Sequence, residues 1–503
     1  MRLESPSPVP LGKMLLSMKA IDLDCYRNWT KARVLSVLLC WCLATASLPA
    51  LARSMPGVHL YSQLARFTGG APVRFIVRDT QGLAGLNVTC SLLGCQVLQA
   101  IGDPDGQLFV IQTSGLVSSP IFLAQLLAAT GITNAEADQR GATPPAASDT
   151  MPWYAYDQIL TNYYGADVWQ GYVFQTPNQI VRTSDTQASF TVSGMGVKVA
   201  LIDTGIDPNN AILAPHLVDG YDFTRNTAGG SEIGDINQST AGVIDGSVQP
   251  VNGSTAAVNQ STAGVIDGLQ YSAFGHGTMT AGIIHLVAPN SWLMPLKSFS
   301  ADGTGYESDV LRAIYYAVSR NAKVINMSFE FTSSSVELAK AITYATSHSV
   351  ICVGSAGNDG SLTIVYPSGL PNVIDVASTS NSNTPSWFSN YGTPPVWISA
   401  PGEAVLTTYP YGTYAVGWGT SFSAPFVSGT VALMASLDST NAGLLNQTTA
   451  AQALSHAQPI QQTGYGFGVL DTYQAVQAWQ DFLTVSVNVS ASCSGISCQA
   501  NIQ

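Results

Sequence analysis

Three short segments, far apart in the chain, each present one residue type that acyl transfer needs. "VKVALIDTGID" ends an apolar run with Asp203, "GHGTMTAGII" holds His276 between two glycines, and "GTSFSAPFVSG" holds Ser421 among small residues. A serine hydroxyl is a weak nucleophile until an imidazole takes its proton, and a carboxylate holds that imidazole in the correct tautomer. Each residue alone has a plainer interpretation, as a turn aspartate, a helix-start histidine or a helix cap. Their joint occurrence favours a catalytic triad.

The elements around these segments predict how the three residues meet. Apolar runs such as "VKVALID", "KVINMSF" and "SVICVGSAG" alternate with helical patterns such as "SDVLRAIYYAVSR". Ser334 and Glu337 form a candidate capping box before the next helix. Near-continuous apolar strands between helices indicate a mostly parallel sheet with helices on both faces, which is a three-layer α/β fold. Active sites of such sheets lie at the carboxyl ends of the strands, so we expect all three residues at one edge.

The helix that begins near Ser421 contains a proline at Pro425. The first four N–H groups of a helix lack partners within the helix. We therefore expect Pro425 to fall in this opening region, where a missing N–H costs little.

These motifs strongly resemble the subtilisin-like serine peptidases, whose triad also follows the chain order Asp, His, Ser. "ALIDTGID", "AFGHGTMTAG" and "GTSFSAPFVSG" match three family signatures, and the resemblance covers nearly the whole main domain. It implies a serine endopeptidase in which Asp203 orients His276, His276 acts as base and then acid, and Ser421 is the nucleophile. "SAGNDG" resembles the family segment whose asparagine, here Asn358, completes the oxyanion hole with the N–H of Ser421.

The resemblance also places substrate-binding strands beside the cleft, in "SADGTGYES" and "NMSFEF". The residues expected there are Ser328, Phe329, Glu330, Ser355 and Gly357. The family usually has Ser-Leu-Gly-Gly where this chain has Ser-Phe-Glu-Phe, so Glu330 and Phe331 either narrow or recharge the pocket or turn outward. No cofactor is required for catalysis. The family often binds structural calcium, but the sequence shows no clear ligand cluster.

The first 53 residues are interpreted as a signal peptide region. Lys31 and Arg33 precede the apolar run "VLSVLLCWCLA", and "ALA" at 50–52 offers small residues for cleavage. A membrane anchor is the alternative, but the run is shorter than the roughly 18–20 residues that a span needs. We therefore expect a secreted or periplasmic protein without a stable membrane anchor.

The rest of the chain divides into four predicted parts: a small α/β module at 54–137, a linker at 138–152, the catalytic domain at 153–480 and a short tail at 481–503. Within the domain, residues 232–272 form a predicted surface insertion in which "NQSTAGVIDG" occurs twice. By the resemblance, the module is a propeptide that inhibits its own enzyme until the linker is cut. A permanent accessory domain is the alternative.

Composition restricts the partners. The chain of 503 residues is 46% hydrophobic and only 10% charged, with a net charge of −12. An acidic surface repels polyanions, so nucleic acid is not an expected partner. Protein or peptide substrates are the expected partners, and we expect a monomer.

The sequence contains two C-x4-C pairs that disulfides could close in an oxidising compartment, Cys90 with Cys95 and Cys493 with Cys498. A zinc site is the less favoured interpretation, because neither cysteine pair has a histidine nearby. Cys352 is interpreted as a thiol of the hydrophobic core.

Two other functions compete with the peptidase. A silent binding protein on the same fold would not need the full set of catalytic residue types. An acid peptidase of the sedolisin type uses Ser-Glu-Asp chemistry, and His276 in "GHGT" argues against it.

Overall fold

A computed structural model describes residues 72–114, 119–143, 151–235, 258–259, 271–392, 395–438 and 443–491, without the side chains of 258–259 and 486–491. All of these residues belong to one compact unit. The predicted signal region, the pair Cys493 and Cys498, and almost all of the duplicated segment lie outside the described residues.

The centre of the molecule is an eight-stranded sheet. Its strand order is β10-β9-β12-β8-β14-β15-β16-β17, and every neighbouring pair is parallel except β10 with β9. The predicted mostly parallel sheet is therefore confirmed. In sheet order the strands are β10 (Thr227–Ala228), β9 (Tyr221–Asp222), β12 (Trp292–Lys297), β8 (Lys198–Asp203), β14 (Val324–Met327), β15 (Ile351–Ser355), β16 (Ile374–Thr379) and β17 (Ile398–Pro401).

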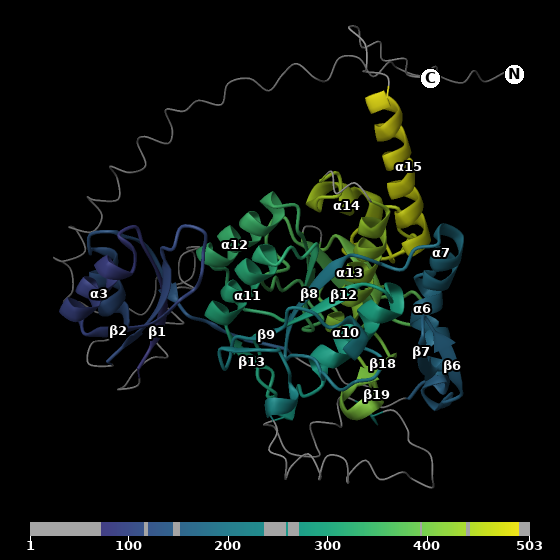
Figure 1. Cartoon of the computed structure of the whole chain (residues 1–503), viewed down its shortest axis with the longest axis horizontal. Helices are drawn as coiled ribbons and strands as arrows, with labels where there is room; N and C mark the ends of the chain where they lie inside the picture. The colour runs from purple at the N-terminus through teal and green to yellow at the C-terminus, as the bar shows by residue number, and fades with distance from the viewer. Residues whose placement is uncertain are drawn as a thin grey trace, which may run out of the picture. The chain divides into compact units, whose positions relative to one another are not determined.

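Helices cover both faces of this sheet because successive side chains of a strand point to opposite faces. In β8, Val199 and Leu201 join the core under α10 (His276–Val287) and α13 (Thr420–Leu437), whereas Ala200 and Ile202 join the core under α11 (Glu307–Ser319) and α12 (Val336–Ser347). Figure 1 shows the two helix pairs. The α13 helix is long and apolar enough to cross a membrane, but 89% of it is buried here.

Smaller elements surround this core. The helix α15 passes the predicted tail boundary at 480, where Trp479 stacks on Phe482 with ring centroids 5.2 Å apart. The remaining bounds are β6 (Leu160–Tyr163), β7 (Ala166–Trp169), α5 (Gln170–Phe174), α6 (Thr176–Ile180), α7 (Thr183–Phe190), β11 (Val258–Asn259), β18 (Val405–Tyr409), β19 (Thr413–Gly417), α14 (Gln447–Leu454) and α15 (Thr472–Ala491), with short 3-10 turns at Trp153–Tyr156, Ala214–His216, Ile233–Asp235 and Pro410–Gly412.

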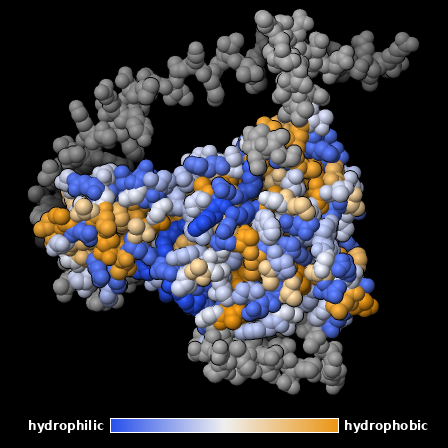
Figure 2. All heavy atoms as spheres, in the orientation of Figure 1, coloured by the Kyte–Doolittle hydropathy of each residue, from blue (hydrophilic) through white to orange (hydrophobic). Residues whose placement is uncertain are grey.

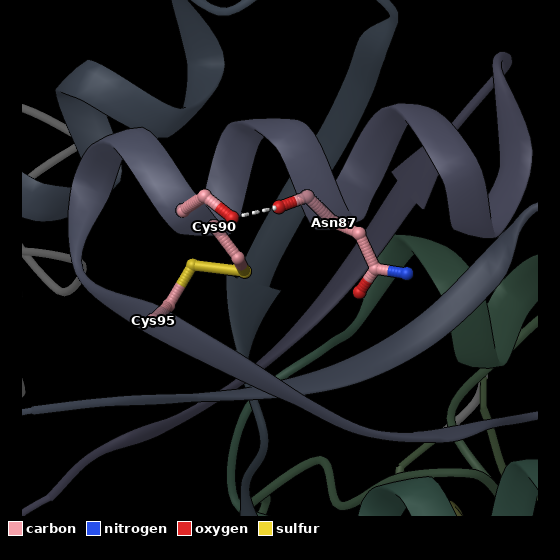
Figure 3. Close-up of a disulfide and its surroundings, with 4 residues drawn as sticks. Asn87, Cys90 and Cys95 are labelled. Carbon is pink, nitrogen blue, oxygen red and sulfur yellow. Dashed lines mark hydrogen bonds between the residues drawn. A yellow bond between two sulfur atoms is a disulfide. The ribbon is translucent and has the colours of Figure 1, made fainter.

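The segment before the catalytic domain folds as a four-stranded antiparallel sheet, ordered β2-β3-β1-β4, with two helices packed on one face. The predicted disulfide between Cys90 and Cys95 is confirmed and joins the end of α3 to β2 (Figure 3). Cys352 is a buried free thiol, as predicted. The bounds are β1 (Arg74–Asp79), α3 (Gly82–Leu93), β2 (Cys95–Ala100), β3 (Leu108–Thr113), α4 (Ser119–Leu127) and β4 (Ile132–Ala137).

Neither α3 nor β2 was expected from the sequence pattern. The helix α3 exposes Leu83, Val88 and Leu92, and apolar surface gathers over it in Figure 2. Apolar side chains on its outer side therefore weaken the one-sided pattern by which helices are recognised.

Two carboxylates, one in β4 of this module and one at the first residue of the predicted linker, cap helices of the catalytic domain. Glu136 accepts hydrogen bonds from the N–H groups of Val336 and Glu337 and from the Ser335 hydroxyl, at 2.7–3.1 Å. The predicted capping box is therefore wrong. The N-cap of α12 is Ser335 rather than Ser334, and Glu337 pairs with Arg78 of the module instead. Asp138 likewise accepts from the N–H and hydroxyl of Ser308 at the start of α11.

The predicted linker contains a strand, β5 (Arg140–Ala142), that the sequence analysis missed. It pairs antiparallel with β13 (Thr304–Tyr306) on one side, and Ala142 bridges Glu330 on the other. The three residues Arg-Gly-Ala have no strand pattern of their own. They form a strand because β13 and the segment at Glu330 offer backbone hydrogen bonds on its two sides.

Candidate active site

Asp203 is the last residue of β8, at the carboxyl edge of the sheet. Its side chain is buried, and Oδ1 lies 2.7 Å from the Nδ1 atom of His276 and accepts from the N–H of Thr204. The second oxygen, Oδ2, accepts from the hydroxyl of Thr280 at 3.1 Å. The carboxylate is therefore held by several donors and can hold the imidazole in one orientation.

His276 is the first residue of α10 and is almost completely buried. Gly275 adopts φ 86°, in the left-handed region that favours glycine. A Cβ at Gly277 would lie 1.9 Å from the carbonyl oxygen of Gly205, in the loop after β8. The glycines on both sides of His276 thus allow the start of the helix to approach the end of the strand that bears Asp203.

Ser421 is the second residue of α13, after an N-cap at Gly419. Pro425 is therefore the sixth residue of the helix, and its predicted place in the opening turn is wrong. A residue with an N–H at 425 would bond the carbonyl of Ser421. Here the hydroxyl of Ser328 donates to that carbonyl at 3.0 Å, so a neighbouring strand end replaces the hydrogen bond that proline cannot make.

The Ser421 hydroxyl donates to the backbone carbonyl of Ser328 at 3.3 Å, and within the described part of the chain it forms no hydrogen bond to His276. The start of α13 nevertheless lies next to His276, because the ring of Phe422, the residue after Ser421, lies 5.7 Å from the imidazole, between ring centroids. Hydrogen bonds of catalytic groups are often long or misaligned before substrate binds. A hydrogen bond to His276 therefore requires that the Ser421 hydroxyl rotate away from the carbonyl of Ser328.

Asn358 lies in the loop after β15, next to the start of α13. Its amide oxygen accepts from both the N–H and the hydroxyl of Thr420, at 2.9 and 3.0 Å. Because the amide oxygen faces Thr420, the Nδ2 atom of Asn358 points away from Thr420. This Nδ2 atom lies 3.3 Å from the position that a Cβ on Gly419 would take. The amide is thus held in one orientation beside the residue that precedes the helix.

Glu232 lies at the border of the predicted surface insertion and is not among the predicted site residues. The side chain is fully buried and accepts from the N–H of Gly275 at 2.9 Å and from the hydroxyls of Thr204 and Thr278. Burial raises the pKa of this carboxyl to about 8. Glu232 therefore ties the segment before His276 to the segment after Asp203, and a lone Glu in "GGSEIG" gave no sequence signal for this.

The predicted substrate-binding residues form two walls. Ser328, Phe329 and Glu330 follow β14, whereas Ser355 and Gly357 lie at the end of β15. Between the first wall and β13 lies β5, whose Ala142 exchanges two backbone hydrogen bonds of 2.9 Å with Glu330. The N–H of Thr143 donates to Gly303 at 3.1 Å. The first wall and the β13 segment thus bind an extended peptide segment through their backbones.

No group of three or more His, Cys, Asp or Glu residues gathers among the described residues in a way that could hold a metal ion. Structural calcium stays an open expectation.

Comparison with known proteins agrees with this geometry. Residues 194–468 match the subtilase family. The chain is 31% identical over 303 residues to thermitase of Thermoactinomyces vulgaris, covering 58% of this chain and 92% of thermitase. It is 29% identical over 340 residues to a thermophilic serine proteinase of a Bacillus species (66% and 73% covered), and 34% over 252 residues to subtilisin BL of Lederbergia lenta (48% and 77%). The chain belongs to the subtilase family and is a serine endopeptidase.

Proposed function

We propose that Ser421 is the nucleophile, His276 the general base and acid, and Asp203 the residue that orients the imidazole. The observation that supports this most directly is the buried contact of 2.7 Å between His276 Nδ1 and Asp203 Oδ1, at the edge where α13 begins with Ser421. With Nδ1 facing a carboxylate, the other ring nitrogen, Nε2, is the one that can accept a proton.

In the proposed reaction, His276 Nε2 takes the proton of Ser421 Oγ while that oxygen attacks the carbonyl carbon of the substrate. The tetrahedral intermediate collapses as the amine leaves with the proton from His276, which leaves an acyl group on Ser421. Water, activated by the same imidazole, attacks this ester and releases the second product. Asp203 stabilises the imidazolium in each half of the reaction.

The negative oxygen of the tetrahedral intermediate needs preorganised donors. We assign this role to the side-chain amide of Asn358 and the N–H of Ser421. The first N–H groups of a helix have no partners within the helix and lie at the positive end of its dipole, and Thr420 holds the oxygen of Asn358 away from this side.

We further propose that residues 54–137 form a propeptide and that the protein is a secreted, self-processed zymogen. The pairing of β5 with Glu330 and β13 supports this, because a strand of the chain itself occupies the walls that would bind a substrate. Thr143 is followed in the sequence by Pro144 and Pro145. Since proline cannot donate to a neighbouring strand, we expect self-cleavage on the C-terminal side of Pro145 and before Trp153.

Replacing the nucleophile tests both proposals. Ser421→Ala is expected to lower kcat by about 10⁶-fold, a magnitude measured in subtilisin, to lose labelling by a fluorophosphonate, and to stay as one chain after signal removal. The matched control is Ser436→Ala on the same helix, whose hydroxyl only bonds a backbone carbonyl. Substantial activity in Ser421→Ala contradicts the triad. Cleavage of the linker in that variant, made in a host without other active peptidases, contradicts self-processing alone.

A further inference from the structure

By the resemblance to the subtilisin-like family, glycine is usual at the position of Glu330, and the side chain of Glu330 does not turn outward here. Its Oε2 atom lies 3.1 Å from the position that a Cβ on Gly357 would take. Gly357 directly precedes Asn358, and Ser328, two residues before Glu330, contacts Ser421. The carboxylate therefore reaches across from one wall to the other, beside the proposed nucleophile and oxyanion donor.

The two phenylalanines that flank Glu330 behave differently. Phe329 and Phe331 are buried, and Phe329 packs against Phe299 with ring centroids 4.8 Å apart. The side chain of Glu330 alternates with them and stays partly exposed. Since both phenylalanines are part of the core, Glu330 is the residue of this segment whose side chain can meet a substrate between the walls.

A second carboxylate reinforces the negative charge. Asp359 follows Asn358, and Asn390 fixes it by donating to its Oδ2 at 3.2 Å and by accepting from its N–H at 2.9 Å. Burial, and then the charge of Asp359, raise the pKa of Glu330 to about 7. A cation placed between the walls would relieve this unfavourable state.

In the described ranges, neither Glu330 nor Asp359 forms an ion pair. Some buried acids of the described residues have a cation, as Glu337 has Arg78 and Asp235 has Lys297. Others, such as Glu307 and Asp375, have none but are fully enclosed, whereas Glu330 stays partly exposed, so a substrate can reach it. A mostly buried carboxylate without a cation costs free energy. Glu330 is such a group, and its backbone already pairs with Ala142 of β5. This arrangement indicates that a bound peptide supplies the missing cation.

We propose that Glu330, assisted by Asp359, makes this enzyme select substrates that place a lysine or arginine side chain between Glu330 and Gly357. The inference rests on the proposed function, because it assumes that the peptide bond beside this space is attacked by Ser421. It differs from a plain blocking role, in which Glu330 fills the space and admits only small side chains.

The test compares arginine with citrulline, which has the same shape without the charge. Four peptides with a fluorogenic leaving group are identical except for arginine, citrulline, phenylalanine or alanine at the residue before the scissile bond. For the processed wild-type enzyme at pH 8, we expect kcat/KM for arginine to exceed that for citrulline by about 10- to 100-fold, as for a charge-assisted hydrogen bond. Glu330→Gln should reduce this ratio to less than about 3-fold, and Asp359→Asn should reduce it partly.

Asp481→Asn is the control, since Asp481 is an exposed acid on α15, and its arginine-to-citrulline ratio should equal that of the wild type. Equal rates for arginine and citrulline in the wild type overturn the inference without any variant. The blocking role would be established instead by three results together. The wild-type enzyme prefers alanine, Glu330→Gln keeps this preference, and Glu330→Gly also hydrolyses the phenylalanine peptide. If no peptide is hydrolysed and fluorophosphonate does not label Ser421, the proposed function fails rather than the specificity.

Discussion

At the scale of single residues, the site is built from side chains whose polar atoms are nearly all engaged. Asp203 accepts from Thr204, Thr280 and His276, and Asn358 accepts twice from Thr420. Such groups need no reorganisation when charge develops in the reaction, which is the basis of electrostatic catalysis.

The role of Asn358 is open to direct measurement. Asn358→Ala should lower kcat by about 10²- to 10³-fold, the cost of one oxyanion donor in subtilisin, with little change in KM because the donor acts on the transition state. Thr420→Val removes one of the two hydrogen bonds that orient Asn358 and leaves the other, so we expect a smaller loss in kcat. Steady-state kinetics on one peptide decide this. A loss of less than 3-fold in Asn358→Ala, or a loss expressed only in KM, would assign the oxyanion hole elsewhere.

At the scale of elements, the fit of β5 depends on one glycine. A Cβ at Gly141 would lie 2.7 Å from Cε1 of Phe331 and 2.9 Å from the carbonyl oxygen of Glu330. Phe331 is fully buried and the carbonyl belongs to the backbone, so neither can move aside cheaply. The wall beside Gly141 therefore leaves no room for a side chain at this position of β5.

Gly141→Ala should loosen β5 in the uncut protein. The measurement is hydrogen exchange of the amides of Ala142 and Thr143 in the Ser421→Ala background, since these N–H groups bond Glu330 and Gly303. We expect their protection to fall at least about 10-fold, which corresponds to about 1.4 kcal/mol. Asp105→Ala, in an exposed turn of the module, is the control and should leave the protection as it is. Unaltered exchange in Gly141→Ala would mean that Phe331 and the backbone of Glu330 shift to make room for the added methyl group.

At the scale of the whole molecule, the module and the catalytic domain meet through buried carboxylates. Burial raises the pKa of Asp138, against the opposing effect of Arg74. Burial and the neighbouring Glu136 raise the pKa of Glu307 well above its ordinary value. Burial also raises the pKa of Asp309 to about 6. Several charged groups face one another across this contact. They are Arg74, Arg78, Asp103 and Glu136 from the module, Asp138 from the predicted linker, and Glu307, Asp309, Arg312, Glu337 and Lys340 from the domain.

These shifts predict that the contact weakens as the pH rises. A carboxyl whose pKa is raised in the contact stabilises it fully below the ordinary value near 4, and this contribution is lost as the pH rises through the raised pKa. In Ser421→Ala, protection of the Ala142 amide, corrected for the intrinsic exchange rate, should therefore decrease between about pH 4 and pH 7. Glu307→Gln, which cannot ionise, should flatten this dependence. A protection that grows with pH would show that the ion pairs with Arg74 and Arg78 dominate.

The sheet, the helices on its two faces and the edge that bears Asp203, His276 and Ser421 could all be predicted from the sequence. Near-continuous apolar runs and the helical period of 3.6 are local features of the sequence, and the carboxyl ends of parallel strands share one edge whatever the loops do. Only the tertiary structure decided four further features. Glu232 is buried in what reads as a loop, Glu136 and Asp138 cap helices about 200 and 170 residues away in the sequence, the hydroxyl of Ser328 replaces the bond that Pro425 lacks, and Glu330 points inward. Each depends on a partner distant in the chain, and the conformation of a short polar segment is set by the partner that satisfies its hydrogen bonds.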